Sequence, residues 1–408
     1  MTNTPASPVH DIGRYQPVPS REDLVQRARE LRPLLRECAA ATEHARQLLP
    51  EVDAQFLAAG FFRIMQPATY GGFELGIETL LDVVVEIGRG CGSSAWVLSL
   101  LAIHNWVVGM FPKAAQDEIF GNHGSARLPL VLAPQGTAEV APGGYCVSGQ
   151  WTYASGIDVA NWVGIAVLDP AQPVGAPPRL LTCIVRREEV TIHDDWFVLG
   201  LRGTGSKAAV LRNVFVPAHR AMSLLEAETQ GPPGALVNTG PLYRGVPRVP
   251  IFCMCATAPA IGIARSMLDF YQERIETHKN AYMAAKHTDS AASQQRLARA
   301  TALIDSAELL LRSDAGAVAA MIEGGGKQSL VERGRMRMHM AEALRLCTEA
   351  VDLLFVDAGT GAMFVQSPLQ RAFRDIHAIH THVALNYDSA AENFGRVLLG
   401  LKPNSPLI

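Results

Sequence analysis

One stretch of this chain decides its fold: GLRGTGS at residues 200–206, followed by VFVP at residues 214–217. The glycines indicate a tight turn that joins two strands, and VFVP closes the second of these strands. The same turn carries Thr204, Gly205 and Ser206, whose backbone N–H groups and hydroxyls could cradle a phosphate or the ring edge of a ligand. Both interpretations stay open, because a glycine turn needs no ligand to explain it.

A block of short, β-rich runs surrounds this turn and extends from about residue 128 to residue 222. The runs are separated by glycine and proline turns, a pattern typical of strands. We therefore expect a small β domain set into a helical protein. Strands are predicted at residues 145–147, 162–168, 180–185 and 210–216, with turns at Pro142-Gly143-Gly144 and in the PVGAPP stretch at 173–178.

Helical patterns flank the β block on both sides. On the N-terminal side, residues 24–40 and 80–110 carry apolar residues at helical spacing, and the PATYGG turn at 67–72 is the main break. On the C-terminal side, residues 251–399 predict long antiparallel helices packed as a four-helix bundle, interrupted at 324–326 and 359–361.

These patterns predict an α+β, mainly α fold with three parts in chain order. A Pro/Gly-rich stretch at 231–250 is expected to form a loop, which could act as a lid over a site. The expected parts are an N-terminal helical domain (1–127), a central small β domain (128–225) and a C-terminal helical bundle (226–408).

Composition narrows the class of protein. Charged residues make up 18% of the 408 and hydrophobic residues 48%, which indicates large buried interfaces and hence an oligomer, a homotetramer or a dimer. The net charge of -3, without a long charged run, favours neither nucleic acid nor an anionic membrane surface.

Two further features indicate where the protein resides. The most apolar stretch, 95–111, is interrupted by His104 and Asn105, so we expect a buried core helix and no membrane partner. Seven scattered cysteines without a CxxC pair indicate reduced thiols, and therefore a cytoplasmic protein.

Four motifs and the order of the blocks resemble the acyl-CoA dehydrogenase superfamily over about residues 20–400. The motifs are PATYGG, GLRGTGS with VFVP, YQER at 271–274, and the Arg374-Asp375 pair. The resemblance implies a flavin cofactor. It also implies that Arg274 reaches a flavin across a subunit interface and pairs with its pyrophosphate, whereas the alternative is a solvated helix charge.

The residues near the last motif indicate which branch of the superfamily the chain resembles. Many members place a catalytic Glu eight residues past the Asp of the RD pair, where this chain has Val383, which cannot take a proton. Instead, Arg374-Asp375-Ile376 with His382 resembles the two-component flavin monooxygenases. SSAW at 93–96 with His104, and GQWTYASG at 149–156, resemble motifs of the same branch.

This branch implies an oxygenase component that hydroxylates a phenol- or indole-type aromatic substrate. It would use reduced flavin, with FAD favoured over FMN, and O2 as co-substrate, through a flavin C4a-hydroperoxide. The protein would exclude water and donate a hydrogen bond near flavin N5. No GxGxxG motif follows a strand, so we expect a separate NAD(P)H:flavin reductase to supply the reduced flavin.

The matched motifs predict the residues of a flavin site. Ser155 is expected beside flavin N5, although a serine that caps a tight turn is the simpler explanation. Trp151 and Tyr153 are expected to shape the flavin wall, or else to alternate on a half-buried strand. Thr204, Gly205 and Ser206 would then hold the phosphate or ring edge of this flavin.

Two histidines are predicted to act on the substrate. His104 lies in an apolar helix and would accept a phenol or indole proton, the alternative being a hydrogen-bonded core histidine. His382 would serve the hydroperoxide or substrate side, on a helical face that it shares with Asp375, Ile379 and Asn386. Asn386 is accordingly expected to face the substrate.

The remaining polar residues are given weaker roles. His377 and His380 lie on another face of the same expected helix, so the three histidines do not converge and no metal site is expected. In the 231–250 loop, Tyr243, Arg244 and Arg248 could recognise a substrate carboxylate.

Two other functions stay open at this point. An acyl-CoA dehydrogenase with a displaced base would hold oxidised flavin tightly and would be bleached by an acyl-CoA. An N- or S-oxygenase of the same branch would need no substrate base, so replacing His104 with Asn should spare its activity.

Overall fold

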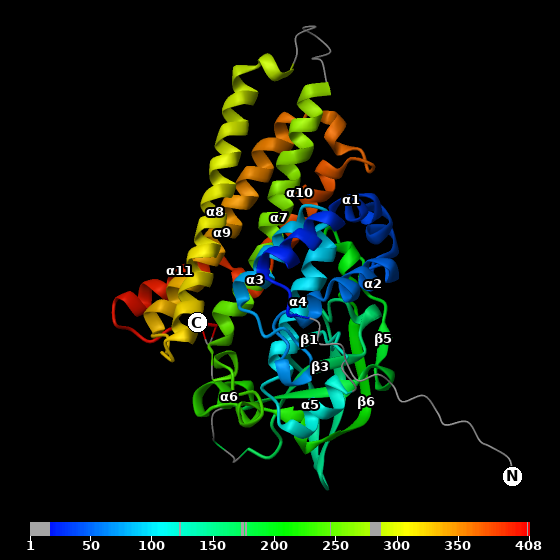
Figure 1. Ribbon diagram of the computed structural model, residues 1–408, viewed down its shortest axis with the longest axis vertical. Helices are drawn as coiled ribbons and strands as arrows, with labels where there is room; N and C mark the ends of the chain where they lie inside the picture. Colours follow the sequence, from blue (N-terminus) through cyan, green and yellow to red (C-terminus); the bar gives the residue numbers. More distant parts are fainter. Residues whose placement is uncertain are drawn as a thin grey trace, which may run out of the picture.

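The computed structural model describes residues 17–121, 124–172, 175, 178–244, 246–277, 287–405 and 407–408. A block of N-terminal helices stands beside a long helical bundle, and a small sheet lies at one end of the molecule (Figure 1). The chain therefore has the expected α+β layout, in the order helices, sheet, helices.

Five α-helices make up the N-terminal block: α1 (Arg21–Ala45), α2 (Pro50–Ala59), α3 (Ile77–Gly88), α4 (Gly92–Val108) and α5 (Lys113–Phe120). The first begins at a capping box, in which Ser20 and Asp23 satisfy each other's backbone N–H groups. The expected helix at 80–110 is in fact two helices. The chain breaks at Gly90, where a side chain would collide with Leu35 of α1.

A seven-stranded sheet forms the middle of the chain, with the strand order β5-β6-β2-β1-β3-β4-β7. All neighbouring pairs are antiparallel except β1 and β3. The four predicted strands are present, whereas β1, β5 and β7 were not predicted. Half of the residues of β1 are exposed, and β5 and β7 have only three and two residues. The strands are β1 (Leu130–Ala141), β2 (Gly144–Trp151), β3 (Trp162–Leu168), β4 (Leu180–Arg186), β5 (Thr191–His193), β6 (Ala208–Pro217) and β7 (Ala221–Met222).

The turns predicted around these strands have different outcomes. Pro142-Gly143-Gly144 forms the tight turn between β1 and β2, with Gly143 at a φ of 82°. Most of the predicted PVGAPP turn, namely residues 173–174 and 176–177, lies outside the described residues.

Five further α-helices follow the loop region: α7 (Arg248–Thr277), α8 (Ala291–Glu323), α9 (Leu330–Asp357), α10 (Pro368–His380) and α11 (Tyr387–Leu398). The first four pack as the bundle, and the breaks predicted at 324–326 and 359–361 are confirmed. By length and composition α7 could span a membrane, but 89% of its most apolar window is buried inside the molecule, as in a core helix.

The 231–250 segment is more ordered than an open loop. It follows α6 (Leu224–Gln230), contains the short helices η7 (Pro233–Leu236) and η8 (Pro241–Tyr243), and gives way to α7 at Arg248. Hydrogen bonds tie it to the N-terminal block, among them those from Gly234 N to Met110 O, from Asn238 Nδ2 to Gly109 O, and from Tyr243 Oη to Met65 O.

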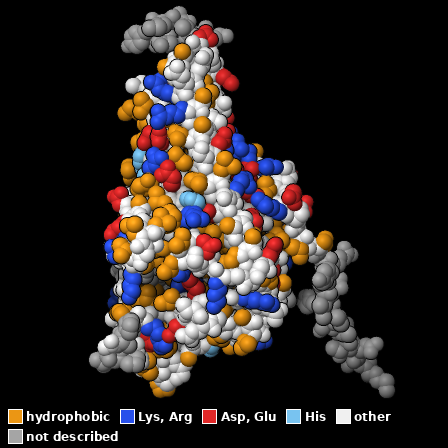
Figure 2. Space-filling model, turned by 90° about the vertical axis from the view of Figure 1, so that its left-hand side faces the viewer, with side chains coloured by type: hydrophobic (Ala, Val, Ile, Leu, Met, Phe, Trp, Pro, Cys, Tyr) orange, Lys and Arg blue, Asp and Glu red, His pale blue; other side chains and the backbone are white. Residues whose placement is uncertain are grey.

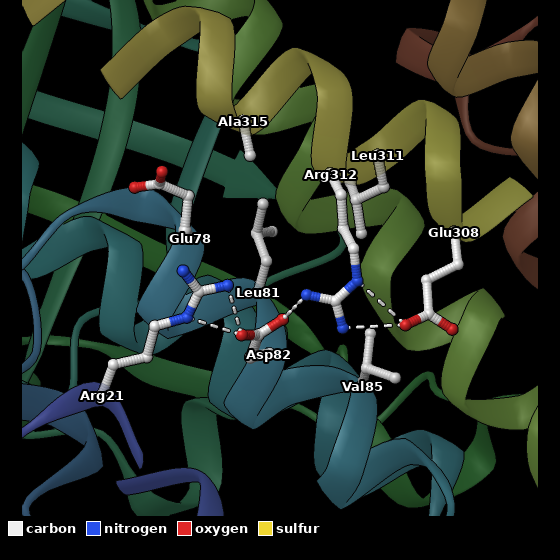
Figure 3. A pocket seen from close by; sticks show the side chains of 9 residues that line it. All are labelled: Arg21, Glu78, Leu81, Asp82, Val85, Glu308, Leu311, Arg312 and Ala315. Atoms are coloured by element: carbon white, nitrogen blue, oxygen red, sulfur yellow. Dashed lines mark hydrogen bonds and ion pairs between the residues drawn. The ribbon is translucent and has the colours of Figure 1, made fainter. Parts of the chain in front are cut away.

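A chain of ion pairs joins the N-terminal block to the bundle (Figure 3). Asp82 on α3 accepts from Arg21 of α1 at 2.7 Å and from Arg312 of α8 at 2.6 Å, and Arg312 also meets Glu308 at 2.8 Å. These residues line a cavity of about 130 Å³. The charged side chains that line this cavity pair with one another. We therefore interpret it as a gap at a contact between helices and not as the functional site.

The face of the molecule seen at the left of Figure 1 carries charges of both signs. In Figure 2, basic and acidic side chains alternate there with hydrophobic ones, and neither sign gathers into one large patch.

Candidate active site

Four buried polar side chains form a chain of hydrogen bonds between α4 and the GLRGTGS turn. Trp96 Nε1 donates to Ser155 Oγ at 3.1 Å, and Ser155 Oγ lies 2.7 Å from Ser206 Oγ. Ser206 Oγ lies 2.7 Å from Thr204 Oγ1, which donates to the carbonyl oxygen of Leu201 at 2.8 Å. The predicted cofactor residues Ser155, Thr204 and Ser206 are thus brought together.

Close packing explains why the turn is rich in glycine. A Cβ on Gly200 would lie 2.1 Å from the carbonyl oxygen of Arg374, and one on Gly203 would lie 2.5 Å from the side chain of Thr42. Gly205 has a φ of 53°, in the left-handed region that favours glycine. The turn can therefore pack directly against α1 and α10 only if these positions are glycine.

A buried carboxylate holds the start of the same turn. Asp375 of α10 accepts a hydrogen bond from Leu201 N at 2.6 Å, and Leu201 itself has a φ of 52°. Burial raises the pKa of Asp375 to about 6, opposed by this hydrogen bond. Arg374 donates to the carbonyl oxygen of Leu199 at 2.7 Å, so the RD pair anchors the turn to the bundle.

An exposed apolar surface adjoins the hydroxyl chain. The side chains of Tyr153, Phe197 and Leu199 are 68%, 72% and 70% exposed, respectively, and Trp196 meets Tyr153 edge to face at 6.0 Å. Trp196 Nε1 also donates to the carbonyl oxygen of Leu201, at 3.2 Å. An exposed apolar surface beside a cluster of buried hydroxyls suits the isoalloxazine ring of a flavin, which has apolar faces and a polar edge.

Trp151 does not belong to this surface, contrary to the prediction. Its side chain is fully buried in the core of the sheet, and Nε1 donates to the carbonyl oxygen of Ala166 at 2.8 Å. The indole lies over Gly136 and Gly149, where a Cβ would collide with it. The strand interpretation is therefore correct for Trp151, whereas Tyr153 lies past the end of β2 with a φ of 69°.

His382 packs against the ring of Trp96. The two rings meet edge to face, with centroids 5.5 Å apart. His382 Nδ1 accepts a hydrogen bond from Ala384 N at 3.3 Å, and burial lowers its pKa. The neutral ring therefore carries its proton on Nε2 and presents it as a donor.

The helical face predicted for His382 does not exist. The helix α10 ends at His380, and His382 caps the short helix η11 (Val383–Leu385) that follows. Asn386 caps α11 instead, its Oδ1 accepting from Ser389 N at 2.9 Å. No Gly or Pro marks the end of α10, and the sequence therefore gives no warning of this break.

His104 lies on α4 eight residues after Trp96, about 12 Å further along the helix. It is buried, and its Nδ1 lies 2.7 Å from the carbonyl oxygen of Leu128. A carbonyl can only accept, so Nδ1 carries the proton and Nε2 presents a lone pair. Burial lowers the pKa of His104 to about 4, and the ring is neutral at pH 7. Phe252 of α7 faces it edge on, at 6.1 Å.

Comparisons with known proteins identify the family of this chain. Residues 23–120 match the family model described as acyl-CoA dehydrogenase, N-terminal domain, and residues 254–387 match that of its C-terminal domain. The flavin-dependent monooxygenase oxygenase subunit HsaA of Rhodococcus jostii (strain RHA1) is 34% identical to this chain, over 92% of this chain and 98% of its own. The chain belongs to the flavin-dependent monooxygenases.

Two further relatives of this monooxygenase bear on the cofactor. The FADH(2)-dependent resorcinol hydroxylase oxygenase component of Rhizobium sp. (strain MTP-10005) is 33% identical, over 93% of this chain and 95% of its own. The structure of XiaF from Streptomyces sp., in complex with FADH2 and glycerol, superimposes with a TM-score of 0.86 at 28% identity. That superposition covers 95% of this chain and 97% of XiaF.

His377 and His380 both contact residues of α9. His377 Nε2 pairs with Asp352 at 2.9 Å, and His380 Nδ1 lies 3.3 Å from Thr348 Oγ1. His380 lines an open groove of about 570 Å³ on the bundle. Within the described part of the chain, no three His, Cys, Asp or Glu side chains gather as a metal site would require.

The three residues expected to bind a substrate carboxylate are already engaged. Tyr243 is fully buried and its hydroxyl donates to Met65 O at 2.6 Å, while the exposed Arg244 donates to Thr239 O at 2.9 Å. Arg248 is nearly buried, and its Nε donates to Glu228 at 3.0 Å. Tyr243 thus serves the core of the monooxygenase, and Arg248 already has a carboxylate partner.

Arg274 stands far from Ser155 within one chain. It lies in the last turn of α7, at the opposite end of the bundle from the sheet (Figure 1), and its Nε donates to the carbonyl oxygen of Ala358 at 2.8 Å. A contact between Arg274 and a flavin at Ser155 would therefore need a second copy of the monooxygenase.

Several residues of the site escaped the sequence analysis. Trp96 stood in a quoted motif, but nothing in the sequence showed that it would donate to Ser155. Phe252 and Glu228 come from elements distant in the chain and carry no local motif. For Asp375, the Arg374-Asp375 motif was the signal in the sequence, but it did not show that the carboxylate would bind the N–H of Leu201.

Proposed function

We propose that this chain is the oxygenase component of a two-component system that hydroxylates a neutral phenol. The observation that carries the proposal is His104, a buried neutral imidazole whose free nitrogen is an acceptor and whose ring is faced by Phe252. An aromatic ring can pack against Phe252 while its hydroxyl donates to His104 Nε2.

The pKa of His104 decides when the phenol proton moves. With a pKa of about 4, His104 is too weak a base to ionise a resting phenol, so it first only accepts a hydrogen bond. As the ring carbon is attacked, the phenolic oxygen becomes much more acidic, and the proton then passes to Nε2. The interaction is thus strongest in the transition state, where it lowers the barrier.

Residues of four segments would line the proposed flavin site, each with its own role. Bound reduced flavin, together with O2, supplies the oxygen atom for the ring. Ser155 would stand beside N5, Tyr153 and Trp196 along the ring, and Thr204, Gly205 and Ser206 at its edge. His382, with its proton on Nε2, would donate a hydrogen bond to the oxygen that is delivered.

Several features support a particular cofactor and assembly. FAD is favoured over FMN because one relative is named as FADH(2)-dependent and XiaF holds FADH2. A separate reductase would supply this reduced flavin.

A homotetramer or dimer would let Arg274 reach the flavin of a second copy, and would cover the exposed apolar residues Met363, Phe364 and Val365. All seven cysteines are free, as in a cytoplasmic protein.

Arg248 supports a substrate without a carboxylate. It lies one helical turn before Phe252, on the same face of α7, so it is the cation nearest to the proposed ring site along that helix. Its Nε already pairs with Glu228 of α6 at 3.0 Å, and Glu228 also lies 3.5 Å from Arg333. A second carboxylate there would repel Glu228.

The test is turnover under ¹⁸O2 with a flavin reductase and a panel of phenols, indoles, amines and sulfides. We expect neutral phenols such as resorcinol to gain one labelled oxygen atom. Failure of folded protein with bound reduced flavin to label any phenol would contradict the proposal, and labelling of amines or sulfides alone would assign the chain to N- or S-oxygenation.

A further inference from the structure

A buried arginine of the bundle contacts the segment that carries His382. Arg337 lies on α9, and its side chain is only 1% exposed. Within the described part of the chain no carboxylate pairs with Arg337, and the groups that accept its hydrogen bonds are all neutral. A cation in the core gives up its water, and neutral acceptors compensate this loss less well than a carboxylate would. Packing alone therefore does not explain an arginine at this position.

The guanidinium of Arg337 joins three segments of the chain. Its Nε donates to the carbonyl oxygen of Ala384 in η11 at 3.1 Å. One terminal nitrogen donates to Ser389 Oγ in the first turn of α11 at 3.1 Å, and the other donates to the carbonyl oxygen of Leu407 at 2.6 Å. Because a guanidinium is planar and its donors have fixed directions, Arg337 fixes these three segments relative to α9.

The acceptor at Leu407 is itself held in place. Leu407 N donates to Ser405 Oγ at 3.1 Å. The buried side chain of Asn393 accepts from Asn404 N at 2.7 Å and from Ser405 N at 3.0 Å. Its Nδ2 donates to the carbonyl oxygen of Ser389 at 2.7 Å. Two of the three acceptors of Arg337 are thus connected through Asn393, which keeps the guanidinium in one orientation.

The contact with Ala384 leads directly to His382. Ala384 N donates to His382 Nδ1 at 3.3 Å, and Leu385 N donates to the carbonyl oxygen of His382 at 3.0 Å, so η11 is one closed turn. Cys253 Sγ of α7 also lies 3.7 Å from the carbonyl oxygen of Ala384. The N–H of Ala384 decides which nitrogen of His382 carries the proton, so a displacement of this turn would move that proton as well.

We propose that Arg337 is a positioning residue for His382, which holds η11 so that the proton on Nε2 stays in place for the oxygen that is delivered. The inference rests on the proposed role of His382 as a hydrogen-bond donor. Arg337 acts through Ala384 and needs no contact of its own with the flavin or the phenol. The same arrangement explains why α9, which carries none of the predicted site residues, contains a buried cation.

The test combines Arg337→Met with His382→Asn in a double-mutant cycle. The measurement is the fraction of O2 that ends in hydroxylated product, with reduced FAD and resorcinol, while H2O2 accounts for the rest. Arg337→Met alone should lower this fraction about fivefold, because the donor is no longer held. In the His382→Asn background it should change the fraction by less than about 1.5-fold, because two changes that act through one residue do not add.

Two further variants complete the design. Arg337→Lys keeps the charge but cannot hold three acceptors in fixed directions, so it should lower the coupled fraction about twofold, again only while His382 is present. It takes the place of Arg337→Met if that variant does not fold. Ser389→Ala is the matched control, since it removes one partner of the same guanidinium and keeps the bond to Ala384. It should leave the coupled fraction unchanged.

The outcomes separate this inference from the proposed function. If the folded Arg337 variants keep the wild-type coupled fraction, or lower it by the same factor with and without His382, then Arg337 only stabilises the bundle and the inference is wrong. If His382→Asn itself leaves the coupled fraction unchanged, the proposed role of His382 is wrong, and the inference fails with it.

Discussion

His104 and His382 are two buried, neutral histidines that present opposite groups to their surroundings. At His104 a backbone carbonyl takes the proton of Nδ1, which leaves a lone pair on Nε2. At His382 a backbone N–H occupies Nδ1, which leaves a proton on Nε2. One site can only accept and the other can only donate, so backbone contacts and not residue type decide which histidine meets the phenol.

The largest effect is expected from a substitution at His104, which removes the acceptor side of this comparison. In His104→Asn, the amide can still donate to Leu128, but no lone pair stands where Nε2 was. Hydroxylation of phenols should fall about 1,000-fold in kcat/KM, because the proton has no acceptor as the ring is attacked. Product formation and flavin oxidation are followed together, and oxidation should continue without product. Retention of near wild-type hydroxylation would show that His104 only packs the core.

A second prediction concerns stability and pH. The unfolded chain takes up a proton at a histidine near pH 6.5, but folded His104 stays neutral down to about pH 4. The contribution of His104 is therefore complete above pH 6.5 and falls by about 3 kcal/mol as the pH drops towards 4. Denaturant unfolding between pH 4 and 7.5 should give His104→Asn a flatter profile than the wild type.

Asp375 provides the opposite control for that experiment. Its pKa is raised from 3.8 to about 6 in the folded state, so its contribution weakens as the pH rises through this range. Asp375→Asn should therefore make the free energy of unfolding fall more steeply on acidification. Parallel profiles for the wild type and both variants would contradict these assignments.

The third prediction sharpens the role of His382. In His382→Asn, the side-chain oxygen can still accept from Ala384, but the donor no longer reaches as far and the ring contact with Trp96 is lost. The fraction of O2 that ends in product should fall about tenfold, with the rest released as H2O2. Phenol binding should change less than twofold. If phenol binding is lost while the coupled fraction is unchanged, His382 belongs to the substrate side.

The smallest expected effect tests the surroundings of the phenol. Glu228→Gln leaves the charge of Arg248 uncompensated, so phenols that carry a carboxylate should gain about fivefold in kcat/KM relative to neutral phenols. Glu226→Gln is the matched control on the same short helix, because its carboxylate pairs with Arg179 at 3.1 Å instead. An equal response of both variants would place Arg248 outside the substrate site.

Local signals predicted much of this molecule. The block order, four strands and the breaks at 324–326 and 359–361 follow from periodicity and glycine placement, which are properties of short segments. The predicted residues Ser155, Thr204 and Ser206 do meet, because one glycine turn carries two of them and the motif before it carries the third.

What the sequence could not show depends on pairing between distant segments. Trp151 is buried because Gly136 and Gly149 pair across β1 and β2 and leave room for its ring, and no local pattern reveals that register. The directions of the two histidines depend on Leu128 and Ala384, whose backbone groups become neighbours only in the folded chain. Glu228 likewise finds Arg248 only through the fold.

The chain of buried hydroxyls also has an evolutionary consequence. Each hydroxyl bonds to the next one in a buried place, so a change at any one link alters the partners of the others. Substitutions at positions 155, 204 and 206 should therefore be inherited as a set. A lineage that loses one of the three hydroxyls alone would be expected to leave a buried polar group without its partner, at a cost in stability.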